Sequence, residues 1–487
     1  MSDASPARDG EAGRANPAFR RTKIVATIGP ATRSVEALAA LIRAGADVLR
    51  LNFSHGSRAE HAENVALARE AASTAGREVG LLGDLPGPKL RIDEVEGGVV
   101  DLEPGSELTL TTGEGVGGAD HLPVSWEGLP GAVKEGDDVY LADGRVRLRV
   151  VETGEGRIRC EVEVGGPVAS HQGLNVPGTD VPLPSASRTD LDWVDFAVQQ
   201  RIDLLAVSFV RRAEDLQPVE RRVRVAGADI PLIAKIEKPQ AAENAEAIVR
   251  AALGGIMVAR GDLGIELPLE RVPTVQKRLL ALAGRNSRPS ITATQMLASM
   301  VASPRPTRAE VSDVTTAIYQ GTDAVMLSEE TAVGEYPVDA VRVMDRIARE
   351  AEPDLPYGDW VFNRAEASEV AGSVARAAVG STYTLGLAAI VVPTRSGRTA
   401  RLVSAHRPKV PVLAVTPRIE TVRRLQLLFG VSCKLAEDWG SLRALLDDCA
   451  RLAKEAGVAG SGDLIGITAG LPEQELGTNL FEIHRVP

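Results

Sequence analysis

The feature that most constrains the fold is a series of eight short apolar segments that alternate with helix-like stretches. The segments begin at Lys23, Asp47, Val79, Asp203, Pro231, Gly254, Pro289 and Asp323. Each is nearly continuously apolar in its first half, as buried parallel strands are, and turns polar at its C-terminal end. Amphipathic stretches such as VEALAALIRAGA, residues 35–46, lie between most of them. Eight such units in about 240 residues favour an α/β fold of the (β/α)8 TIM barrel type over an open doubly wound sheet.

The alternation is interrupted once, after the third segment. Between residues 93 and 184 the chain has short strand-like runs separated by glycine turns, such as GSELTLTTG, GDDVYLADG, RVRLRVV and RIRCEVEVGG. This pattern indicates a small all-β domain inserted into a barrel loop. The loop leaves the C-terminal face of the strands, where barrel enzymes build their sites, so the inserted domain is expected to close over a substrate as a lid.

The remaining segments complete the predicted domain organisation. Residues 1–20 are polar and predict a disordered tail without a secretory signal. Residues 21–92 and 185–354 form the two parts of the barrel domain. Residues 355–487 alternate again, through AAIVVPTRSG, VPVLAVT and DLIGITAG, which predicts a C-terminal open-sheet α/β domain with a regulatory or dimer-forming role.

Charge and hydropathy exclude two classes of partner. The net charge of −11 argues against nucleic acid, because duplex binding needs a basic face. No run of ~18 apolar residues occurs, so we expect no membrane span. The cysteines Cys160, Cys433 and Cys449 are scattered without CxxC spacing, which favours structural thiols in a reducing cytoplasm. An anionic substrate remains compatible with this charge, since a site needs only local positive charge.

Polar side chains gather where six of the predicted strands end. They are Arg50, Asn52, Ser54 and His55 after the second strand, Asp84, Lys89 and Arg91 after the third, Lys235 and Glu237 after the fifth, Gly261 and Asp262 after the sixth, Thr294 after the seventh, and Ser328 and Glu329 after the eighth. In a barrel these strand ends converge on one mouth. The set therefore predicts a single site.

The chemistry of this set favours a phosphoryl-transfer site. Glu237 and Asp262 supply two carboxylates for a hard divalent cation, and Arg50 and Lys235 supply fixed positive charge for a phosphoryl group. The backbone at Gly261 opens a helix whose free N–H groups can hold a carboxylate or a phosphate. Individually, a Lys-x-Glu pair can be a structural ion pair, ARGD a turn, and Asn52 or Ser54 a helix cap. Together they predict a magnesium-dependent barrel enzyme that acts on a small anionic substrate.

The same residues lie in motifs that resemble the pyruvate kinase family. The matching stretches are RRTKIVATIGPAT, VLRLNFSHG, DLPGPKLR, AKIE, GIMVARGDLGIELP, ATQML, PRPTRAEVSD and MLSEETAVGEYP, and the resemblance runs from about residue 21 to residue 486. It implies transfer of the phosphoryl group of phosphoenolpyruvate to ADP, giving pyruvate and ATP, with Mg2+ or alternatively Mn2+ as cofactor. It also implies a homotetramer.

The resemblance implies a role for each matching residue. Arg50 would hold the transferring phosphoryl group, Lys235 would neutralise developing charge, and Glu237 and Asp262 would bind the metal. The amides of Gly261 and Asp262 would face the substrate carboxylate, and Thr294 and Ser328 would take part in protonation. Asn52, His55, Arg91 and Asp143, the last in the lid, would face the nucleotide.

The resemblance also bears on potassium. Many family members hold K+ with residues matching Asn52, Ser54, Asp84 and the carbonyl of Leu85, and those members carry Glu at the position of Lys89. An ammonium group at Lys89 can supply the positive charge that K+ otherwise brings. We therefore predict activity without added K+; the alternative is that Lys89 points to solvent.

In the C-terminal domain a phosphate-binding loop is expected. Thr394, Arg395, Ser396, Gly397 and Thr399 lie between a predicted strand and a predicted helix, where hydroxyls and free N–H groups can cradle a phosphate. The alternative is an ordinary strand-to-helix turn. Because the final loop, TAGLPEQELGTN, is acidic, AMP or a sugar monophosphate is favoured over fructose bisphosphate as allosteric activator.

Three positions depart from the family pattern. Gln172 stands where Lys is usual, Glu329 where Gly is usual, and Thr316 where Asn is frequent.

Two competing functions stay open at this point. A barrel lyase acting on a pyruvate enolate would need the metal pair but no lid, and a non-enzymatic regulatory relative would have no need to retain Arg50, Lys235, Glu237, Asp262 and Thr294.

Overall fold

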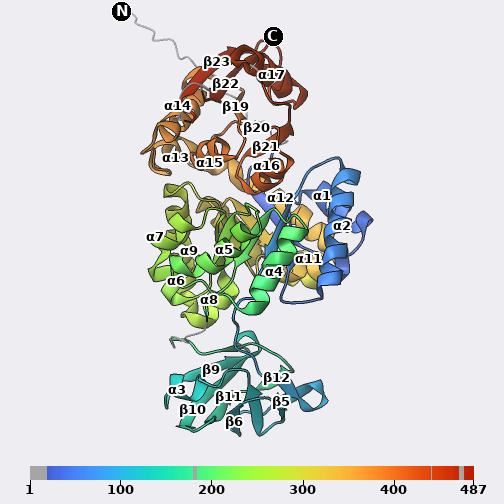
Figure 1. Ribbon diagram of the computed structural model, residues 1–487, viewed down its shortest axis with the longest axis vertical. Coiled ribbons are helices and arrows are strands. Elements are labelled where there is room, and N and C mark those ends of the chain that lie inside the picture. Colours follow the sequence, from blue (N-terminus) through green and yellow to red (C-terminus); the bar gives the residue numbers. More distant parts are fainter. Residues whose placement is uncertain (1–18, 179–183, 440, 471–476) are drawn as a thin grey trace, which may run out of the picture.

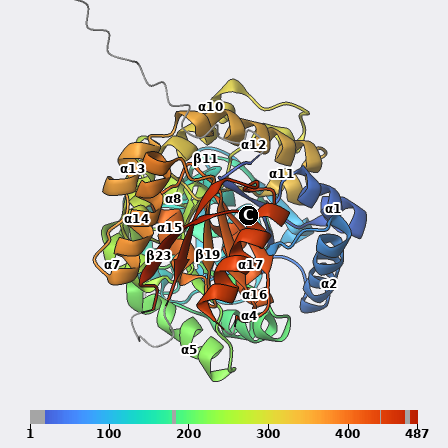
Figure 2. The same ribbon diagram turned by 90° about the horizontal axis from the view of Figure 1, so that it is seen from above.

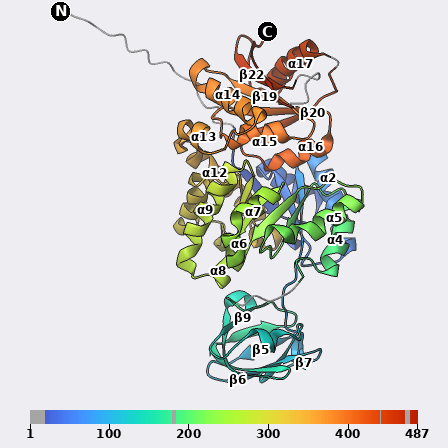
Figure 3. The ribbon, with the colours of Figure 1, turned by 60° about the vertical axis from the view of Figure 1, so that its left-hand side comes forward.

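The structure, a computed structural model, describes residues 19–178, 184–439, 441–470 and 477–487. These residues form three units stacked along the long axis of the molecule, with the barrel in the middle (Figure 1). The all-β unit lies at one end and the C-terminal α/β unit at the other, an arrangement that is also visible from the side (Figure 3). The predicted tail lies almost wholly outside the described residues.

The central unit is the predicted (β/α)8 barrel. Its strands are β1 (Lys23–Thr27), β2 (Val48–Asn52), β3 (Gly80–Asp84), β14 (Leu204–Val207), β15 (Leu232–Ile236), β16 (Gly255–Ala259), β17 (Ser290–Ala293) and β18 (Ala324–Leu327). In the described residues these eight strands close in the order β1-β18-β17-β16-β15-β14-β3-β2. Every predicted segment is thus a barrel strand, and the parallel pairing of β1 with β18, Lys23 opposite Ala324, closes the ring.

Helices surround the barrel and fill the connections between its strands. They are α1 (Val35–Ala44), α2 (Arg58–Ala75), α4 (Arg188–Gln199), α5 (Gln217–Val225), α6 (Pro239–Glu243), α7 (Ala245–Ala251), α8 (Arg260–Glu266), α9 (Val272–Arg285), α10 (Arg308–Tyr319), α11 (Glu329–Ala332) and α12 (Pro337–Ala351). Local sequence fixes several of their ends. Ser57 accepts a hydrogen bond from the N–H of Glu60 while the Glu60 carboxylate returns to Ser57, a capping box that begins α2. Gly45, at φ 127°, ends α1 in a conformation that favours glycine.

The inserted unit is all-β apart from short helical turns, as predicted. Its strands are β4 (Glu94–Val95), β5 (Val99–Leu102), β6 (Glu107–Thr112), β7 (Val116–Gly117), β8 (His121–Val124), β9 (Asp138–Leu141), β10 (Val146–Gly154), β11 (Arg157–Val164), β12 (Gly166–Ala169) and β13 (Leu174–Asn175), with α3 (Leu129–Ala132) between β8 and β9. A six-stranded sheet, β13-β9-β10-β11-β6-β8, wraps a hydrophobic cluster separate from that of the barrel. We call this unit the lid.

The C-terminal unit is an open sheet covered by helices. Its helices are α13 (Tyr357–Asn363), α14 (Val370–Leu385), α15 (Arg398–Ala405), α16 (Ile419–Arg424) and α17 (Leu442–Glu455), and its strands are β19 (Ala389–Pro393), β20 (Val412–Thr416), β21 (Val431–Leu435), β22 (Leu464–Ala469) and β23 (Leu480–Arg485). The order is β21-β20-β19-β22-β23, with β23 antiparallel. The three continuously apolar segments expected here are β19, β20 and β22, at the centre of the sheet. Both edge strands lack such a segment, and reasoning from apolar runs missed them.

The C-terminal unit is seated on the end of the barrel where the strands begin. Viewed from above, it covers that end (Figure 2). Leu427 of the short helix η8 (Leu425–Leu427) belongs to the hydrophobic cluster inside the barrel, beside residues such as Val25 and Met326. Lys23 at the start of β1 donates a hydrogen bond to the carbonyl of Val431, 2.7 Å away. The two units therefore share a packed seam, and the opposite, C-terminal face of the barrel is left for the lid.

Within the described residues, no helix is long and apolar enough to cross a membrane. The domain boundaries at residues 20, 92, 184 and 354 stay predictions, although the first lid strand begins at Glu94 and the next barrel helix at Arg188.

Candidate functional site

Lys235 is the centre of a buried charge cluster at the C-terminal face of the barrel. It follows Ala234 near the end of β15, and its ammonium nitrogen Nζ lies 2.9 Å from Glu237 Oε1 and 3.1 Å from Asp84 Oδ1. It also donates a hydrogen bond to the hydroxyl of Ser208, 2.7 Å away. Three groups from three different strand ends therefore fix the position of this cation.

Arg50 joins the same cluster from β2. Its Nε and Nη2 both lie 2.7 Å from Asp84 Oδ2, and its Nη1 donates to the hydroxyl of Thr27 at 3.1 Å. Asp84 is thus held between the guanidinium of Arg50 and the ammonium of Lys235. The arrangement presents two rigidly positioned cations to the mouth of the barrel.

Burial and charge act against each other on the pKa values of this cluster. Burial would raise the pKa of Asp84, but Lys235 and Arg50 outweigh it and hold that pKa below its ordinary value. Burial would lower the pKa of Lys235, but Asp84 and Glu237 outweigh it and hold that pKa above its ordinary value. Lys235 therefore remains a fixed cation at neutral pH.

Glu237 and Asp262 form a carboxylate pair next to Lys235. Burial raises the pKa of Glu237, Lys235 opposes this, and the nearby charge of Asp262 adds to the rise. A divalent cation fits this place, because it would relieve both the burial of Glu237 and its repulsion by the charge of Asp262. No group of three or more His, Cys, Asp or Glu side chains suited to a metal occurs in the described residues. A cation with few protein ligands that keeps several waters, as Mg2+ does, suits such a pair.

The backbone around the pair adopts unusual conformations. Thr294 and Gln295, which follow β17, have φ values of 70° and 53°, and Phe209 after β14 has 55°. The strained turn at Thr294 brings its hydroxyl to the N–H of Gly261, 2.7 Å away, at the first turn of α8. The N–H of Phe209 donates to Glu237 Oε2 at 2.8 Å. Such strain at strand ends is typical of sites where position matters more than stability.

Lys89 points into the site rather than to solvent. Its side chain is 18% exposed, and its Nζ lies 3.9 Å from Asp262 Oδ1. A Cβ added at Gly173 of the lid would come within 2.2 Å of the Lys89 side chain, so the lid backbone packs directly on it. The solvent-facing alternative for Lys89 is therefore wrong.

The other residues expected around potassium lie at the same strand ends. Asn52 Oδ1 accepts a hydrogen bond from the N–H of Ser54, 3.2 Å away, and Ser54 is exposed. The carbonyl of Leu85 accepts a hydrogen bond from the Ser208 hydroxyl at 2.7 Å. Ser208 therefore links this carbonyl to Lys235.

The expected nucleotide residues lie further out. His55 is exposed, and its carbonyl contacts the ring of His61. Arg91 Nη1 donates to the carbonyl of His171 in the lid, 2.9 Å away. Asp143 belongs to the turn η3 (Ala142–Gly144), which faces α8 across the contact of Gly144 with Ile265, but the side chain of Asp143 lies outside the described part.

Of the three positions that depart from the family pattern, Gln172 and Thr316 have local hydrogen-bond partners. Gln172 Oε1 accepts from the N–H of Ala169 at 2.9 Å, so its side chain folds back on its own loop. The N–H of Ser328 donates to Glu330 Oε2 at 2.6 Å, and Glu330 is buried whereas Glu329 is exposed. Thr316 donates to the carbonyl of Ser312 within α10.

The loop expected to bind a phosphate is a tight turn before α15. Gly397, at φ 83°, donates its N–H to the hydroxyl of buried Thr394, and Thr399 Oγ1 lies 2.5 Å from Thr478 Oγ1. Arg395 and Ser396 are exposed, and Arg395 pairs with Asp438. Residues 471–476 of the acidic final loop lie outside the described residues.

Comparisons with known proteins match both halves of this architecture. The family model for the pyruvate kinase barrel domain matches residues 19–341, and that for the pyruvate kinase alpha/beta domain matches residues 372–484. The chain belongs to the pyruvate kinase family. Because both domains match and the chain is similar over nearly its whole length to proteins named pyruvate kinase, it is an enzyme of that family.

The likeness extends over almost the whole chain. The pyruvate kinase of Geobacillus stearothermophilus is 43% identical over 96% of this chain and 80% of its own length. That of Thermococcus litoralis is 38% identical over 96% of this chain and 99% of its own length. The crystal structure of a pyruvate kinase from Cryptosporidium parvum matches with a TM-score of 0.90 and 35% identity over 96% of each chain.

Sequence reasoning missed two hydroxyls of this pyruvate kinase site. The predicted site draws on the ends of six strands and on neither the first nor the fourth. Thr27 ends the first strand and contacts Arg50, and Ser208 follows the fourth and contacts Lys235. Both lie where the other six strands carry their polar groups, so the same rule applied to KIVATIG and DLLAVSFV would have found them.

Proposed function

We propose that the cluster at the C-terminal face transfers the phosphoryl group of phosphoenolpyruvate to ADP, giving pyruvate and ATP. The observation that carries this proposal is the fixed cation pair of Arg50 and Lys235, held by buried Asp84 at the mouth of a pyruvate kinase barrel. During its transfer, a phosphoryl group carries negative charge on its three outer oxygens. Two preorganised cations stabilise that charge without reorganisation during the reaction.

Glu237 and Asp262 would hold Mg2+, or alternatively Mn2+. When bound, the cation would supply charge neutralisation and a fixed point for the oxygens of substrate and phosphate. Lys235 separates Glu237 from Asp84, so the buried carboxylates do not face one another without a cation between them. The N–H groups at Gly261 and Asp262 would bind the substrate carboxylate at the start of α8, where the N–H of Gly261 would exchange its present acceptor, the Thr294 hydroxyl, for the carboxylate.

Thr294 and Ser328 would act on the enolate carbon. The Thr294 hydroxyl is held by Gly261 on the neighbouring strand end, which keeps it next to the proposed carboxylate position. Ser328 would connect it to solvent as a proton relay, supported by the buried Glu330 that fixes the turn at Ser328. Asn52, His55, Arg91 and Asp143 would bind the nucleotide.

The reaction is tested by measuring pyruvate formation from phosphoenolpyruvate and ADP with Mg2+. The account expects turnover that needs ADP and the divalent cation together. Release of pyruvate without ADP would instead support a lyase or hydrolase. Absence of turnover with AMP and sugar phosphates present would support the non-enzymatic regulatory role.

The position of Lys89 supports catalysis without potassium. Its ammonium lies beside Asp262 under the lid, so it brings a positive charge to the site that needs no free cation. We expect similar kcat values with and without K+, in buffers where tetramethylammonium replaces it. The variant Lys89→Glu should lose most activity without K+ and regain part of it with K+, while Lys89→Gln should not respond in this way. A wild-type enzyme that turns over only when K+ is added would contradict the role of Lys89.

The loop of Thr394, Arg395, Ser396, Gly397 and Thr399 would bind the phosphate of an allosteric activator. AMP or a sugar monophosphate suits it better than fructose bisphosphate, because the exposed cations at the loop, Arg395 and Arg398, each already pair with a carboxylate, Asp438 and Glu369. Activation by AMP that Arg395→Gln weakens would support this site; stronger activation by fructose bisphosphate would contradict the choice. A homotetramer in the cytoplasm completes the proposal.

A further inference from the structure

The lid rests on one end of helix α8 through a buried polar contact. The side-chain amide Nδ2 of Asn175, in lid strand β13, donates a hydrogen bond to Glu266 Oε1, 3.1 Å away. Asn175 is 4% exposed and Glu266 is 7% exposed. Glu266 is the last residue of α8, and the first turn of the same helix carries Gly261 and Asp262. The lid is therefore tied to the helix that begins at the candidate site.

A cation from a third segment shares this carboxylate oxygen. The ammonium Nζ of Lys238 also donates to Glu266 Oε1. The Glu266 side chain is 3% exposed and that of Lys238 is 21% exposed, so the cation reaches from solvent to a carboxylate that is almost dry. Lys238 directly follows Glu237 in the chain, and its ammonium lies 5.8 Å from the centroid of the Phe209 ring.

The alternative interpretation is an ordinary ion pair that stabilises the barrel. Two physical arguments disfavour it. The partial charge at the C-terminal end of a helix is negative, so a carboxylate at the last residue of α8 is disfavoured there. A buried ion pair also adds little to stability compared with apolar side chains of similar volume. The lid supplies a better reason for the carboxylate, because the amide of Asn175 needs an acceptor where it meets the barrel.

The contact at Glu266 also fixes the part of the lid that faces the site. Strand β13 pairs with β9, with Asn175 opposite Tyr140, and β9 leads directly into the turn η3. This turn packs on α8, since a Cβ added at Gly144 would come within 3.2 Å of the Ile265 side chain. Docking of Asn175 therefore brings the turn that carries Asp143 onto α8.

We propose that Glu266 is a positioning residue that holds the lid on α8, with Lys238 as the counter-charge that this requires. Docking of the lid removes water from the carboxylate, and Lys238 compensates for the lost hydration. The inference rests on the proposed function, in which the turn at Asp143 binds the nucleotide. Arg50 and Lys235 belong to the barrel, so the contact acts on ADP more than on phosphoenolpyruvate.

The position of the lid can be measured without substrate, by double electron–electron resonance between two nitroxide labels. Glu135 in the lid and Lys277 on α9 are exposed and are replaced by Cys for labelling. Cys433→Ser accompanies them, because Cys160 and Cys449 are buried. The protein with its native lid contacts should give a single short distance.

Asn175→Ala in the labelled protein removes the donor of the lid and should add a longer distance. The ratio of docked to undocked lid should fall about tenfold, since a hydrogen bond to a charged group is lost. Equal distance distributions with and without Asn175→Ala would overturn the proposal.

The counter-charge role makes a separate demand. Lys238→Met leaves the carboxylate of Glu266 with the amide of Asn175 alone, and undocking lets water reach that charge, so this variant should also show the longer distance. Adding Glu266→Gln removes the charge and keeps an oxygen for Asn175. The double variant Lys238→Met/Glu266→Gln should therefore regain most of the short distance. A double variant no better docked than Lys238→Met would contradict the role of Lys238.

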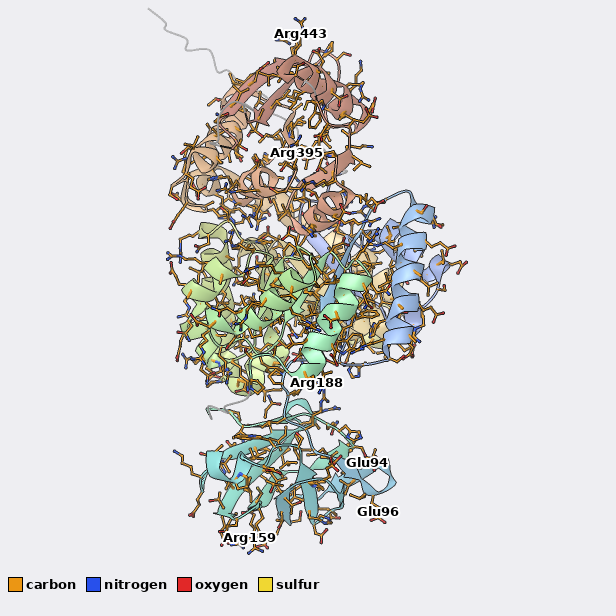
Figure 4. The ribbon with its side chains drawn as sticks, viewed as in Figure 1. Glu94, Glu96, Arg159, Arg188, Arg395 and Arg443 are labelled. Carbon is orange, nitrogen blue, oxygen red and sulfur yellow. The ribbon has the colours of Figure 1, made fainter. Side chains whose placement is uncertain are left out.

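A matched control removes a charged contact from the lid at a place away from α8. Arg159 pairs with Glu107 and Glu152 within the lid, and Figure 4 shows it at the end of the lid that is far from the barrel. Arg159→Gln should keep the wild-type distance. A change as large as that caused by Asn175→Ala would show that the loss of any lid contact undocks the lid, and would overturn the specific role of Glu266.

Steady-state kinetics connect the position of the lid to the reaction. Asn175→Ala should raise KM for ADP about tenfold and change KM for phosphoenolpyruvate less than about threefold, because the nucleotide needs the docked lid. Equal increases in both constants would contradict the proposal. An inactive wild-type protein would instead overturn the proposed function, and the distance measurements would still decide whether Glu266 holds the lid.

Discussion

At the scale of single residues, Lys235 depends on neighbours that do not themselves carry charge. Ser208 accepts a hydrogen bond from Lys235 and donates one to the carbonyl of Leu85, so it connects β15 to the loop after β3. It is 2% exposed, which leaves no room for water to replace it. We infer that Ser208 is a positioning residue that fixes the direction of the Lys235 ammonium.

Replacing Ser208 by Ala should therefore lower kcat more than it raises KM for phosphoenolpyruvate. We expect a loss of about tenfold to a hundredfold in kcat, because the ammonium keeps its charge but loses one of its three anchors. Steady-state kinetics of Ser208→Ala and of Ser208→Thr provide the measurement. Ser208→Thr keeps the hydroxyl and should recover part of the rate; equal loss in both variants would indicate a packing effect instead.

At the scale of elements, α15 is joined to α13 through a buried histidine at its C-terminal end. His406 is 1% exposed, and its Nδ1 donates to the carbonyl of Val361 at 2.8 Å. Burial lowers the pKa of His406 to about 4 from an ordinary 6.5, with Arg376 contributing. The imidazole is therefore neutral in the folded protein at pH values where the unfolded chain would protonate it.

This difference predicts a pH dependence of stability. Between pH 6.5 and about 4 the unfolded state binds a proton that the folded state does not, so stability is full above 6.5 and falls as the pH decreases through this window. The loss should be on the order of 3 kcal/mol. Urea unfolding of wild type and His406→Gln at a series of pH values measures it. A slope that is the same in both proteins would show that His406 is not its source.

The elements that could be predicted from sequence are those whose burial leaves a simple pattern. The eight barrel strands and β19, β20 and β22 are buried on both faces and are continuously apolar, so their segments stand out. Strands β21 and β23 lie at the sheet edge, carry charged residues such as Lys434 and Glu482, and have no such pattern. Whether a strand lies at the edge of a sheet depends on the tertiary fold, and the sequence of a short segment does not predict it.

The same division applies to the candidate site. Its charged residues could be predicted because strand ends converge in a barrel. The turns at Phe209 and Thr294 could not, since positive φ at non-glycine residues is imposed by the surrounding structure.

At the scale of the whole molecule, the lid and the barrel have separate hydrophobic cores. The lid cluster includes Leu108, Val139 and Ile158, and none of its members belongs to the barrel clusters. The two units meet through a few polar contacts, such as that of Asn175 with Glu266 of α8, 3.1 Å apart. The hydrophobic core of the lid therefore adds little to the stability of the barrel, and we propose that the lid acts by covering the site.

Removal of the lid should leave the rest of the protein folded. Arg91 and Gly173 face each other across an isolated antiparallel bridge, so a short Gly-Ser linker can replace residues 92–172. We expect the shortened protein to keep its barrel helicity by circular dichroism and to lose about a hundredfold or more of its kcat/KM for ADP. An insoluble or unfolded product would show that the lid is needed for folding.

The central claim is that Lys235 stabilises phosphoryl transfer in this barrel. The most direct test compares wild type and Lys235→Ala for transfer of the phosphoryl group from phosphoenolpyruvate to ADP, with circular dichroism and thermal unfolding as checks of the fold. The account predicts active wild type and a kcat about 10³-fold lower or worse in the variant, with the fold intact. A folded Lys235→Ala protein that transfers phosphate at a rate near that of wild type would contradict it.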